Sequence, residues 1–328
     1  MSPTIKDVAL AAGVSVGTVS KVLNKTGTIA AVTRERVAQV AQALNFRPNT
    51  LAQSLHSGLS GSIGLISNDS FGRFTMPIME GLEAVLATEG VGVFMCNATD
   101  DPERERRHVE QLLSKQIDGL IVTSRRSDHR PAMQLAGLRI PVIHVFAHSD
   151  DPDALSLLPD DEGGARLAVE HLLASGRRRI AHITGPARFE AVRLRNAGYH
   201  AAMQSAGISP LPVLHGPWSE AWGREAVAQL LDTPPDAILC GNDQIARGAA
   251  DALREAGRRV PQDVALIGFD NWGVIAEACR PPLSSVDMRL SDLGAEAGRR
   301  MLAMIGGARF HGLERLPCHL ILRASSAS

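Results

Sequence analysis

Several features of secreted proteins, membrane proteins and metalloproteins are missing from this sequence. Its four cysteines, Cys96, Cys240, Cys279 and Cys318, are widely separated and form no CxxC pair. We therefore expect reduced thiols in the core, with neither disulfides nor zinc ligands among them. The N-terminus lacks the apolar run of a signal peptide, and no segment approaches the roughly 18 apolar residues that span a bilayer. These absences predict a cytoplasmic protein.

Motifs of catalysis are missing as well. There is no GxSxG elbow, no phosphate-binding loop and no GxGxxG after a strand. His144 and His148, close to Asp150-Asp151, are possible metal ligands. Four residues along a strand, however, separate the two imidazoles by about 13 Å, too far to share one ion unless the chain bends. We expect neither an enzyme nor a resident metal or cofactor.

The charge of the chain is distributed unevenly. The 328 residues carry a formal net charge of -1, with 45% hydrophobic and 21% charged side chains, as in a globular protein of two or three domains. Residues 1–59 hold six basic and two acidic side chains, a charge of +4 that leaves -5 for the rest. An electrostatic footprint for phosphates is therefore expected on the N-terminal segment alone.

That basic segment contains the pattern of two short helices. Apolar residues at helical spacing predict a first helix after Thr4, namely Ile5, Val8, Ala9 and Ala12. Gly13-Val14 interrupts the pattern, and Ser15 is a suitable cap for a second helix with Val16, Val19, Val22 and Leu23 on it. Two helices joined by a tight turn form a helix-turn-helix, whose second helix enters the DNA major groove. The alternative is an ordinary helical hairpin.

The outward face of the second helix carries groups that suit DNA. Its polar side chains are Thr18, Ser20, Lys21 and Asn24. Hydroxyls, an amide and a cation bind phosphate oxygens and base edges. A third helix is predicted over residues 33–44, with Thr33 as its cap and Val37, Val40, Ala41 and Leu44 as its buried stripe.

The order of these blocks resembles the LacI/GalR family of transcription regulators. The resemblance rests on IKDVA, AGVS and TVSKVLN (residues 5–9, 12–15 and 18–24), on VTRERV and LNFRPN (32–37 and 44–49), and on later blocks up to Leu290. It implies a set of DNA-contacting residues: Thr4, Ser15, Val16, Gly17, Thr18, Ser20, Lys21, Asn24, Asn49 and Leu55. Val16-Gly17 departs from relatives with longer side chains there, so base discrimination would depend on Lys21 and on DNA shape.

The segment from Asn49 to Leu55 is a short helical candidate that begins after Pro48 and ends at the linker 57–61. About seven residues are too few for a stable isolated helix, so its formation must be coupled to a partner. The resemblance names this partner as DNA together with the hinge of a twin subunit. It also implies that Leu55 enters a base step in the minor groove.

From residue 62 onward, strands and helices alternate. The expected strands are 62–67, 91–96, 118–123, 142–146, 180–184, 237–240 and 264–269, and the expected helices are 77–88, 102–115, 130–138, 162–175, 193–206, 219–231 and 244–256. This alternation predicts parallel sheets covered by helices, in two series. The fold class is therefore an all-α helix-turn-helix headpiece plus an α/β core of two doubly wound subdomains. By resemblance the core is like periplasmic sugar-binding proteins.

The resemblance also sets the domain boundaries. Residues 1–59 form the headpiece with its hinge helix, and residues 60–328 form an effector-binding and dimerisation core. Its subdomains are expected to comprise roughly 61–157 with 289–318, and 158–288 with 319–328. Open parallel sheets bind ligands beyond the carboxyl ends of their strands, so the cleft between the subdomains is the expected pocket.

Polar residues follow the expected strands and suit a polyhydroxylated ligand. The predicted effector-binding residues are Asn68, Asp69, Phe71, Arg195, Trp218, Asn242 and Asp270. Arg195 and Asp270 are assigned to the effector site by resemblance, because VRLRNAGY and IGFDN are similar to segments that contact the effector in the family. For Asn242 and Asp243 the alternative, a cap on the following helix, stays open. Phe146 and Leu158 stand where sugar-binding relatives commonly have an acidic and an aromatic residue, which leaves the sugar unspecified.

The sequence therefore indicates a homodimeric, ligand-responsive transcription regulator, expected to be a repressor, that binds a near-palindromic operator and a sugar or sugar derivative. One rival is a periplasmic-type solute-binding protein, which would have a signal peptide and no basic headpiece. Another is a sugar-modifying enzyme, which would need an acid–base pair or nucleophile in the cleft.

Overall fold

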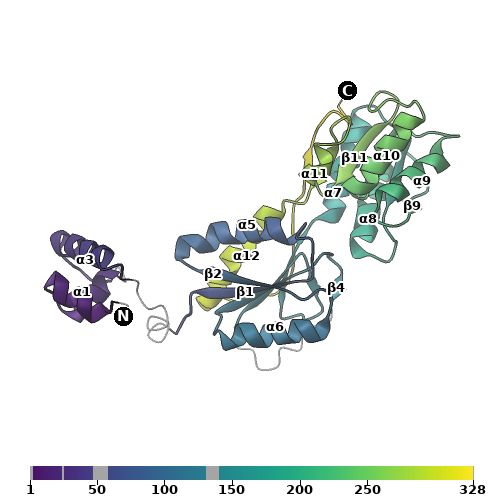
Figure 1. The fold of residues 1–328 in the computed structure, drawn as a ribbon. Coiled ribbons are helices and arrows are strands. Elements are labelled where there is room, and N and C mark those ends of the chain that lie inside the picture. Colours follow the sequence, from purple (N-terminus) through teal and green to yellow (C-terminus); the bar gives the residue numbers. More distant parts are fainter. Residues whose placement is uncertain (1–2, 24–25, 47–57, 131–139, 328) are drawn as a thin grey trace. The chain divides into compact units, whose positions relative to one another are not determined.

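A computed structural model describes residues 3–23, 26–46, 58–130 and 140–327 (Figure 1). The chain forms two compact units, Met1–Gly61 and Ser62–Ser328. Asn24, Asn49 and Leu55, with the expected hinge helix, lie outside the described residues.

The described residues of the first unit form three helices around a small apolar core. They are α1 (Ile5–Ala12), α2 (Val16–Leu23) and α3 (Ala31–Ala43). Gly13 ends α1 in the left-handed conformation with φ of 66°, which a residue without a Cβ adopts at no steric cost. The buried core consists of Val8, Ala9, Ala12, Val19, Val22, Val37 and Ala41. The predicted pair of helices and their tight turn are confirmed.

The third helix begins earlier than predicted. The backbone N–H of Arg34 already bonds to the carbonyl of Ala30 at 3.0 Å, so the helix starts at Ala31 and Thr33 lies inside its first turn. Thr33 is therefore not the cap, because the alanines before it are good helix formers and extend the helix towards the N-terminus. Leu44, expected in the buried stripe, follows the helix and is exposed.

The second unit contains two six-stranded sheets. The first is entirely parallel, in the order β13 (Gly312–Leu316), β7 (Leu155–Pro159), β5 (Val142–Val145), β3 (Gly119–Thr123), β1 (Ser62–Ser67), β2 (Gly92–Asn97). The second has the order β14 (His319–Ile321), β12 (Ser284–Asp287), β11 (Ala265–Phe269), β10 (Ala237–Cys240), β8 (Ile180–Thr184), β9 (Leu214–His215), with β14 antiparallel to β12. We call the two sheets with their helices the first and second subdomains.

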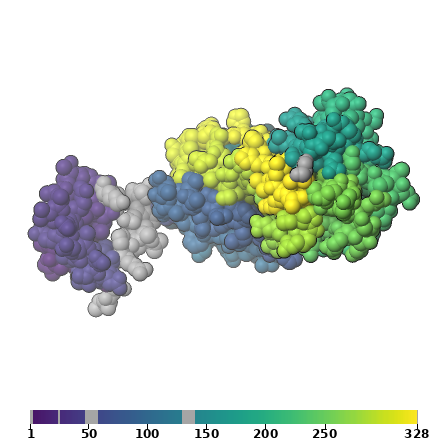
Figure 2. Space-filling model, turned by 90° about the horizontal axis from the view of Figure 1, so that it is seen from above, coloured from purple at the N-terminus to yellow at the C-terminus, as the bar shows by residue number. Residues whose placement is uncertain are grey.

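The chain passes between the subdomains three times. It leaves the first sheet after Pro159, returns between Asp287 and Leu290, and crosses again between Leu316 and His319. The expected crossings were near 157, 288 and 318. Figures 1 and 2 both show the yellow C-terminal segments against each of the two subdomains.

Helices cover both faces of each sheet. In the first subdomain α5 (Thr75–Leu86) and α12 (Leu290–Ile305) pack side by side, with α6 (Pro102–Ser114) on the other face (Figure 1). In the second, α7 (Asp161–Ala174) pairs with α8 (Glu190–Ser205), and α9 (Glu220–Leu230) with α10 (Asp243–Glu255), followed by the short α11 (Gly273–Ala276). A Cβ on Gly81 of α5 would lie 1.7 Å from the Ser291 carbonyl oxygen of α12, so the two helix backbones are in contact.

Most of the local predictions for this unit hold. All seven predicted strands are present within one or two residues of their expected ends. Among the predicted helices, residues 130–138 differ, because His129–Arg130 is a short strand, β4, beside β6 (His148–Ser149). Residues 131–139 lie outside the described part. The four cysteines are free thiols, of which Cys240, Cys279 and Cys318 are buried.

Candidate functional sites

Helix α2 separates a buried apolar face from an outward face. Val19 and Val22 are buried, whereas Gly17 and Lys21 are exposed and Val16 is 41% exposed. The Ser15 hydroxyl accepts the backbone N–H of Thr18 at 3.1 Å, which confirms the predicted cap. The outward face therefore lies on a rigid, capped helix.

Thr4 and Lys21, two further predicted DNA-contacting residues, have neighbours inside the first unit. The backbone N–H and the hydroxyl of Thr4 both donate to the Asp7 carboxylate at 2.7 Å, and these bonds lower the pKa of Asp7. The aliphatic stem of Lys21 lies beside Gly27, where a Cβ would be 3.5 Å from its Cδ. Lys21 itself is exposed.

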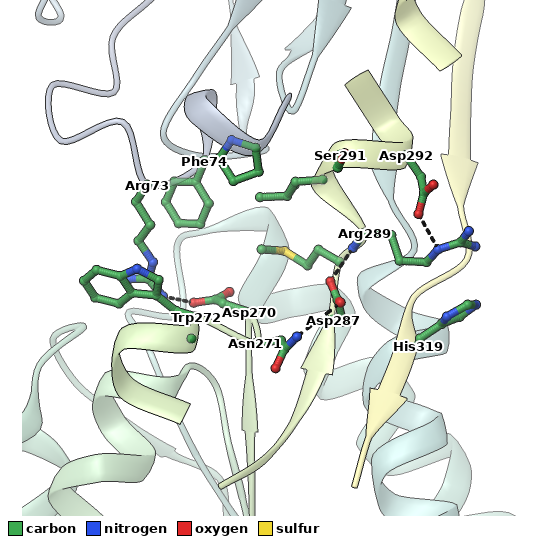
Figure 3. A pocket seen from close by; sticks show the side chains of 14 residues that line it. Arg73, Phe74, Asp270, Asn271, Trp272, Asp287, Arg289, Ser291, Asp292 and His319 are labelled. Carbon is green, nitrogen blue, oxygen red and sulfur yellow. Dashed lines mark hydrogen bonds and ion pairs between the residues drawn. The ribbon is translucent and has the colours of Figure 1, made fainter. Parts of the chain in front are cut away.

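In the second unit the carboxyl ends of the two sheets supply the loops of the cleft. The loops after β1 and β3 come from the first subdomain, and the loops after β8, β10 and β11 come from neighbouring strands of the second. A cavity of about 520 Å³ lies between the loop after β1, the loop after β11 and the segment 287–292 that leads into α12 (Figure 3). It is lined by Arg73, Phe74, Pro77, Asp270, Asn271, Trp272, Gly273, Asp287, Met288, Arg289, Leu290, Ser291, Asp292 and His319.

An ion pair between Arg73 and Asp270 crosses from one subdomain to the other. Arg73 donates to the Asp270 carboxylate and, through Nη1, to Gln244 Oε1 at 3.2 Å. Its guanidinium lies 4.4 Å from the Trp272 ring centroid and 5.0 Å from that of Phe74. Figure 3 shows the side chain reaching from the β1–α5 loop towards Trp272 and Asp270. The planar cation is thus held by charge and by two aromatic faces.

Arg195 lies deeper than a simple ligand contact would require. Its side chain is 5% exposed, and its Nε and Nη2 bind the fully buried carboxylate of Asp161 at 2.8 and 2.7 Å. Its Nη2 is 4.0 Å from Asp270, and its guanidinium stacks 3.6 Å over the Phe269 ring. The structure brings the predicted pair Arg195 and Asp270 together, in a network that is part of the core.

The buried carboxylates of this network have raised pKa values. Burial raises the pKa of Asp161 and of Asp270, although Arg195 and Arg73 oppose the effect. For Asp243, burial and the nearby Asp270 charge raise the pKa to about 7. Its two oxygens accept from the Ser285 hydroxyl and the Trp272 backbone N–H, both at 2.6 Å. A carboxyl that titrates near neutrality therefore lies beside the cavity.

A second set of contacts crosses the cleft between the loops after β3 and β8. Arg126 lies 5.0 Å over the Phe189 ring, and the Glu190 backbone N–H donates to Asp128 at 2.7 Å. Phe189 also faces the predicted residue Trp218, with ring centroids 6.5 Å apart. Trp218 therefore contributes to an aromatic wall, although it does not line the cavity itself.

Of the remaining predicted effector residues, Asn242, Asp69 and Asn68 have structural partners. Asn242 caps α10 by accepting the Ile245 backbone N–H at 2.8 Å, as the open alternative expected. Asp69 accepts the backbone N–H groups of Phe74 and Thr75, and Asn68 binds Asp100 and the N–H of Arg125. Phe71 is 98% exposed and does not line the cavity.

Both departures from the sugar-binding pattern are buried apolar residues. Phe146 has a positive φ of 53° and stacks on Phe74, with centroids 4.9 Å apart. Leu158 is fully buried in β7. Neither offers a polar group to a ligand.

Three residues at the cavity were not predicted from the sequence: Arg73 and Phe74 of the first subdomain and Trp272 of the second. Their positions in the sequence could have indicated all three. They follow Asp69 and Asp270 in the loops that begin where β1 and β11 end, and such loops line the pocket of an open sheet.

Neither a metal centre nor a membrane span is present within the described ranges. No cluster of three or more His, Cys, Asp or Glu is placed to hold a metal ion there. No helix in that part of the chain is long and apolar enough to cross a bilayer.

The fold and the helix-turn-helix define the class of protein. Residues 4–49 match the model of bacterial regulatory proteins of the lacI family, and residues 169–326 match a periplasmic binding protein-like domain. The chain belongs to the LacI family and is a DNA-binding transcriptional regulator with a ligand-binding core.

Its curated relatives are similar over nearly the whole chain. The ribose operon repressor of Halalkalibacterium halodurans is 33% identical over 92% of this chain and 90% of its own. The HTH-type transcriptional repressor PurR of Haemophilus influenzae is 34% identical over 99% of both chains. These relatives are repressors and not enzymes.

Solved structures show the same arrangement. The lac repressor dimer bound to operator and the anti-inducer ONPF has a TM-score of 0.79 and 30% identity, covering all of both chains. The complex of the transcriptional regulator CelR with cellobiose has a TM-score of 0.68 and 28% identity, covering 99% of this chain and all of the other. The predicted fold class is confirmed.

Proposed function

We propose that this protein is a homodimeric repressor that binds a near-palindromic operator through α2, and that a small polyhydroxylated ligand in the core cavity controls its affinity for DNA. As a regulator of transcription it would act in the cytoplasm. The observation that carries the proposal is the capped helix α2, whose outward face lies on the unit with a charge of +4, in a chain whose other unit contains a ligand-sized cavity.

The DNA contacts proposed are the outward residues of α2. Lys21 is exposed on α2, so its ammonium group can reach a guanine edge or a phosphate. Ser15, Thr18 and Ser20 offer hydroxyls to phosphates, and Val16 offers a methyl contact. Thr4, Gly17, Asn24, Asn49 and Leu55 complete the proposed set. The lac repressor structure in complex with operator supports this assignment.

The ligand is proposed to bind in the cavity beside Asp270 and Arg195, between the subdomains. Trp218 would contribute an apolar face, and Asn68, Asp69, Phe71 and Asn242 would have secondary roles. The volume of about 520 Å³ suits a monosaccharide or disaccharide derivative. The anti-inducer in the lac repressor complex and cellobiose in the CelR complex support a sugar-like ligand.

Exposed apolar residues support a dimer of the core. Strand β2 lies at the edge of its sheet and exposes Phe94 and Met95, each 47% exposed. An exposed apolar edge strand is a liability unless a partner covers it. A twofold dimer would cover this edge and match a palindromic operator.

The test is selection of DNA from a random pool by the full chain, followed by affinity measurements on the selected sequence. A palindromic site bound by a dimer is expected. Lys21→Ala should weaken operator binding by about 1–3 kcal/mol and random DNA much less. Lys6→Ala, an exposed lysine on α1, is the matched control and should affect operator and random DNA equally. No selected site, or equal losses for both variants on both DNAs, would contradict the proposal.

A further inference from the structure

Two buried polar atoms without partners belong to residues that line the same cavity. Arg73 uses Nη1 and Nη2 for Gln244 and Asp270, but its buried Nε–H has no acceptor among the described residues. The Asn271 amide donates through Nδ2 to Asp287 at 3.2 Å, while its buried Oδ1 receives no hydrogen bond within that part of the chain. Leaving such groups unsatisfied costs free energy, so a ligand that hydrogen-bonds to them would gain affinity.

The two atoms require different chemistry. Arginine Nε and one Nη point in parallel, a geometry that matches the two oxygens of a carboxylate or phosphate. The Asn271 oxygen needs a donor, and the contact of Nδ2 with Asp287 identifies which end of the amide is the oxygen. An anionic group at Arg73 and a hydroxyl at Asn271 would satisfy both.

The ion pair between Arg73 and Asp270 favours the same ligand. In this structure Asp270 is the counterion of Arg73, and the two residues come from different subdomains. A neutral ligand that used Asp270 would separate this buried pair and leave the guanidinium without an anion, which is strongly unfavourable. A ligand with its own acidic group would replace Asp270 as the partner of Arg73, and its hydroxyls could then donate to the released carboxylate.

We propose that the ligand of the cavity is a polyhydroxylated anion, a sugar acid or a sugar phosphate, whose acidic group binds Arg73. The inference rests on the proposed ligand-controlled function and names its ligand class. Arg73 is thereby the specificity-determining residue. When the anion binds, its acidic group takes the place of Asp270 as the partner of Arg73.

The test compares matched pairs of neutral and acidic probes by thermal shift of the full chain. Suitable pairs are sorbitol and gluconate, glucose and glucuronate, and glucose and glucose 6-phosphate, together with the corresponding pairs of the other common hexoses and pentoses. At least one acid is expected to raise the midpoint while its neutral partner does not. Carboxylate and phosphate arms distinguish the two sources of the anion. Stabilisation by neutral members only, or by no probe, overturns the inference.

Variants then locate the effect. Arg73→Gln removes the charge and keeps a shorter polar side chain, and should weaken binding of the acid roughly 30-fold or more in calorimetry. Arg247→Gln makes the same charge change on α10 outside the cavity and should bind like the parent. Equal affinity of the Arg73 variant and the parent would refute the role of Arg73. Operator selection is independent of both measurements, so a chain that binds the acid but no DNA would refute the proposed function and keep this inference.

Discussion

The neutral imidazole of His182 should make the stability of the second subdomain depend on pH. His182 is fully buried in β8, where its Nδ1 lies 2.9 Å from the Leu239 carbonyl oxygen and so carries the proton, and its ring lies beside Tyr199. Burial lowers its pKa from 6.5 to about 4. Its Nε2 is also buried, so protonation would place an unsatisfied cation in the core.

The direction of this pH dependence follows from the protons that the folded and unfolded chains bind. Between pH 6.5 and 4 the unfolded chain binds a proton at His182 and the folded chain does not, so the free energy of unfolding falls as the pH falls through this window. A pKa of about 4 in place of 6.5 corresponds to roughly 3 kcal/mol, at about 1.4 kcal/mol per pH unit. Below pH 4 the loss is complete, and above 6.5 the full stability is present.

The measurement is urea unfolding of the parent and of His182→Asn at a series of pH values, followed by tryptophan fluorescence. All three tryptophans, Trp218, Trp222 and Trp272, lie in the second subdomain and report on the region around His182. Asparagine does not titrate, so the stability of the parent relative to the variant should fall by about 3 kcal/mol from pH 6.5 to 4. A constant packing cost of the substitution shifts the difference but not its slope. A difference that does not change with pH would refute the reasoning.

Three further predictions concern the core. The pKa of Asp243 is raised to about 7, so its contribution to the free energy of unfolding is present at low pH and is lost as the pH rises from about 4 to 7, opposite to that of His182. Asp243→Asn should remove this pH dependence in the same unfolding experiment. An unchanged pH dependence would contradict the assignment. Gly81→Ala should lower the free energy of unfolding by about 1–3 kcal/mol or more, although alanine favours helix, because the new Cβ would meet the backbone of α12. Gly92→Ala is the control: nothing lies within 4 Å of its Cβ, so the urea midpoint should stay nearly unchanged. Arg195→Ala should cost about 3–5 kcal/mol by leaving Asp161 buried without its cation, and adding Asp161→Asn should recover part of the loss; no recovery would show that the two residues are not coupled.

The helix-turn-helix could be predicted from sequence because everything that forms it is local. Gly13 supplies the turn, Ser15 the cap, and Val19 and Val22 the buried face, all within ten residues. The strands of the core were also readable, since short β-branched runs between helical patterns are a local signal. The start of α3 was misplaced, because a good cap residue, Thr33, lies behind two alanines that are equally able to begin the helix.

The site was only partly predictable, because its geometry depends on distant partners. Arg73 and Asp270 are 197 residues apart, and no local pattern indicates that the two loops meet. For Arg195 the sequence suggested a ligand contact, but its closest partner is the buried Asp161 on α7. Polar residues that follow a strand often cap the next helix, and both Asn242 and Asp69 do so here.

Strand β1 joins the N-terminal unit to the loop that carries Arg73. Its first residue, Ser62, directly follows the N-terminal unit, and the loop after its last residue, Ser67, carries Arg73. All six of its residues are buried between β2 and β3, so the strand cannot bend or slide independently of its sheet. At about 3.3 Å per residue it is a stiff rod of roughly 20 Å. Strand β1 therefore connects the loop beside the cavity directly to the start of the core, through a single element that moves only together with its sheet.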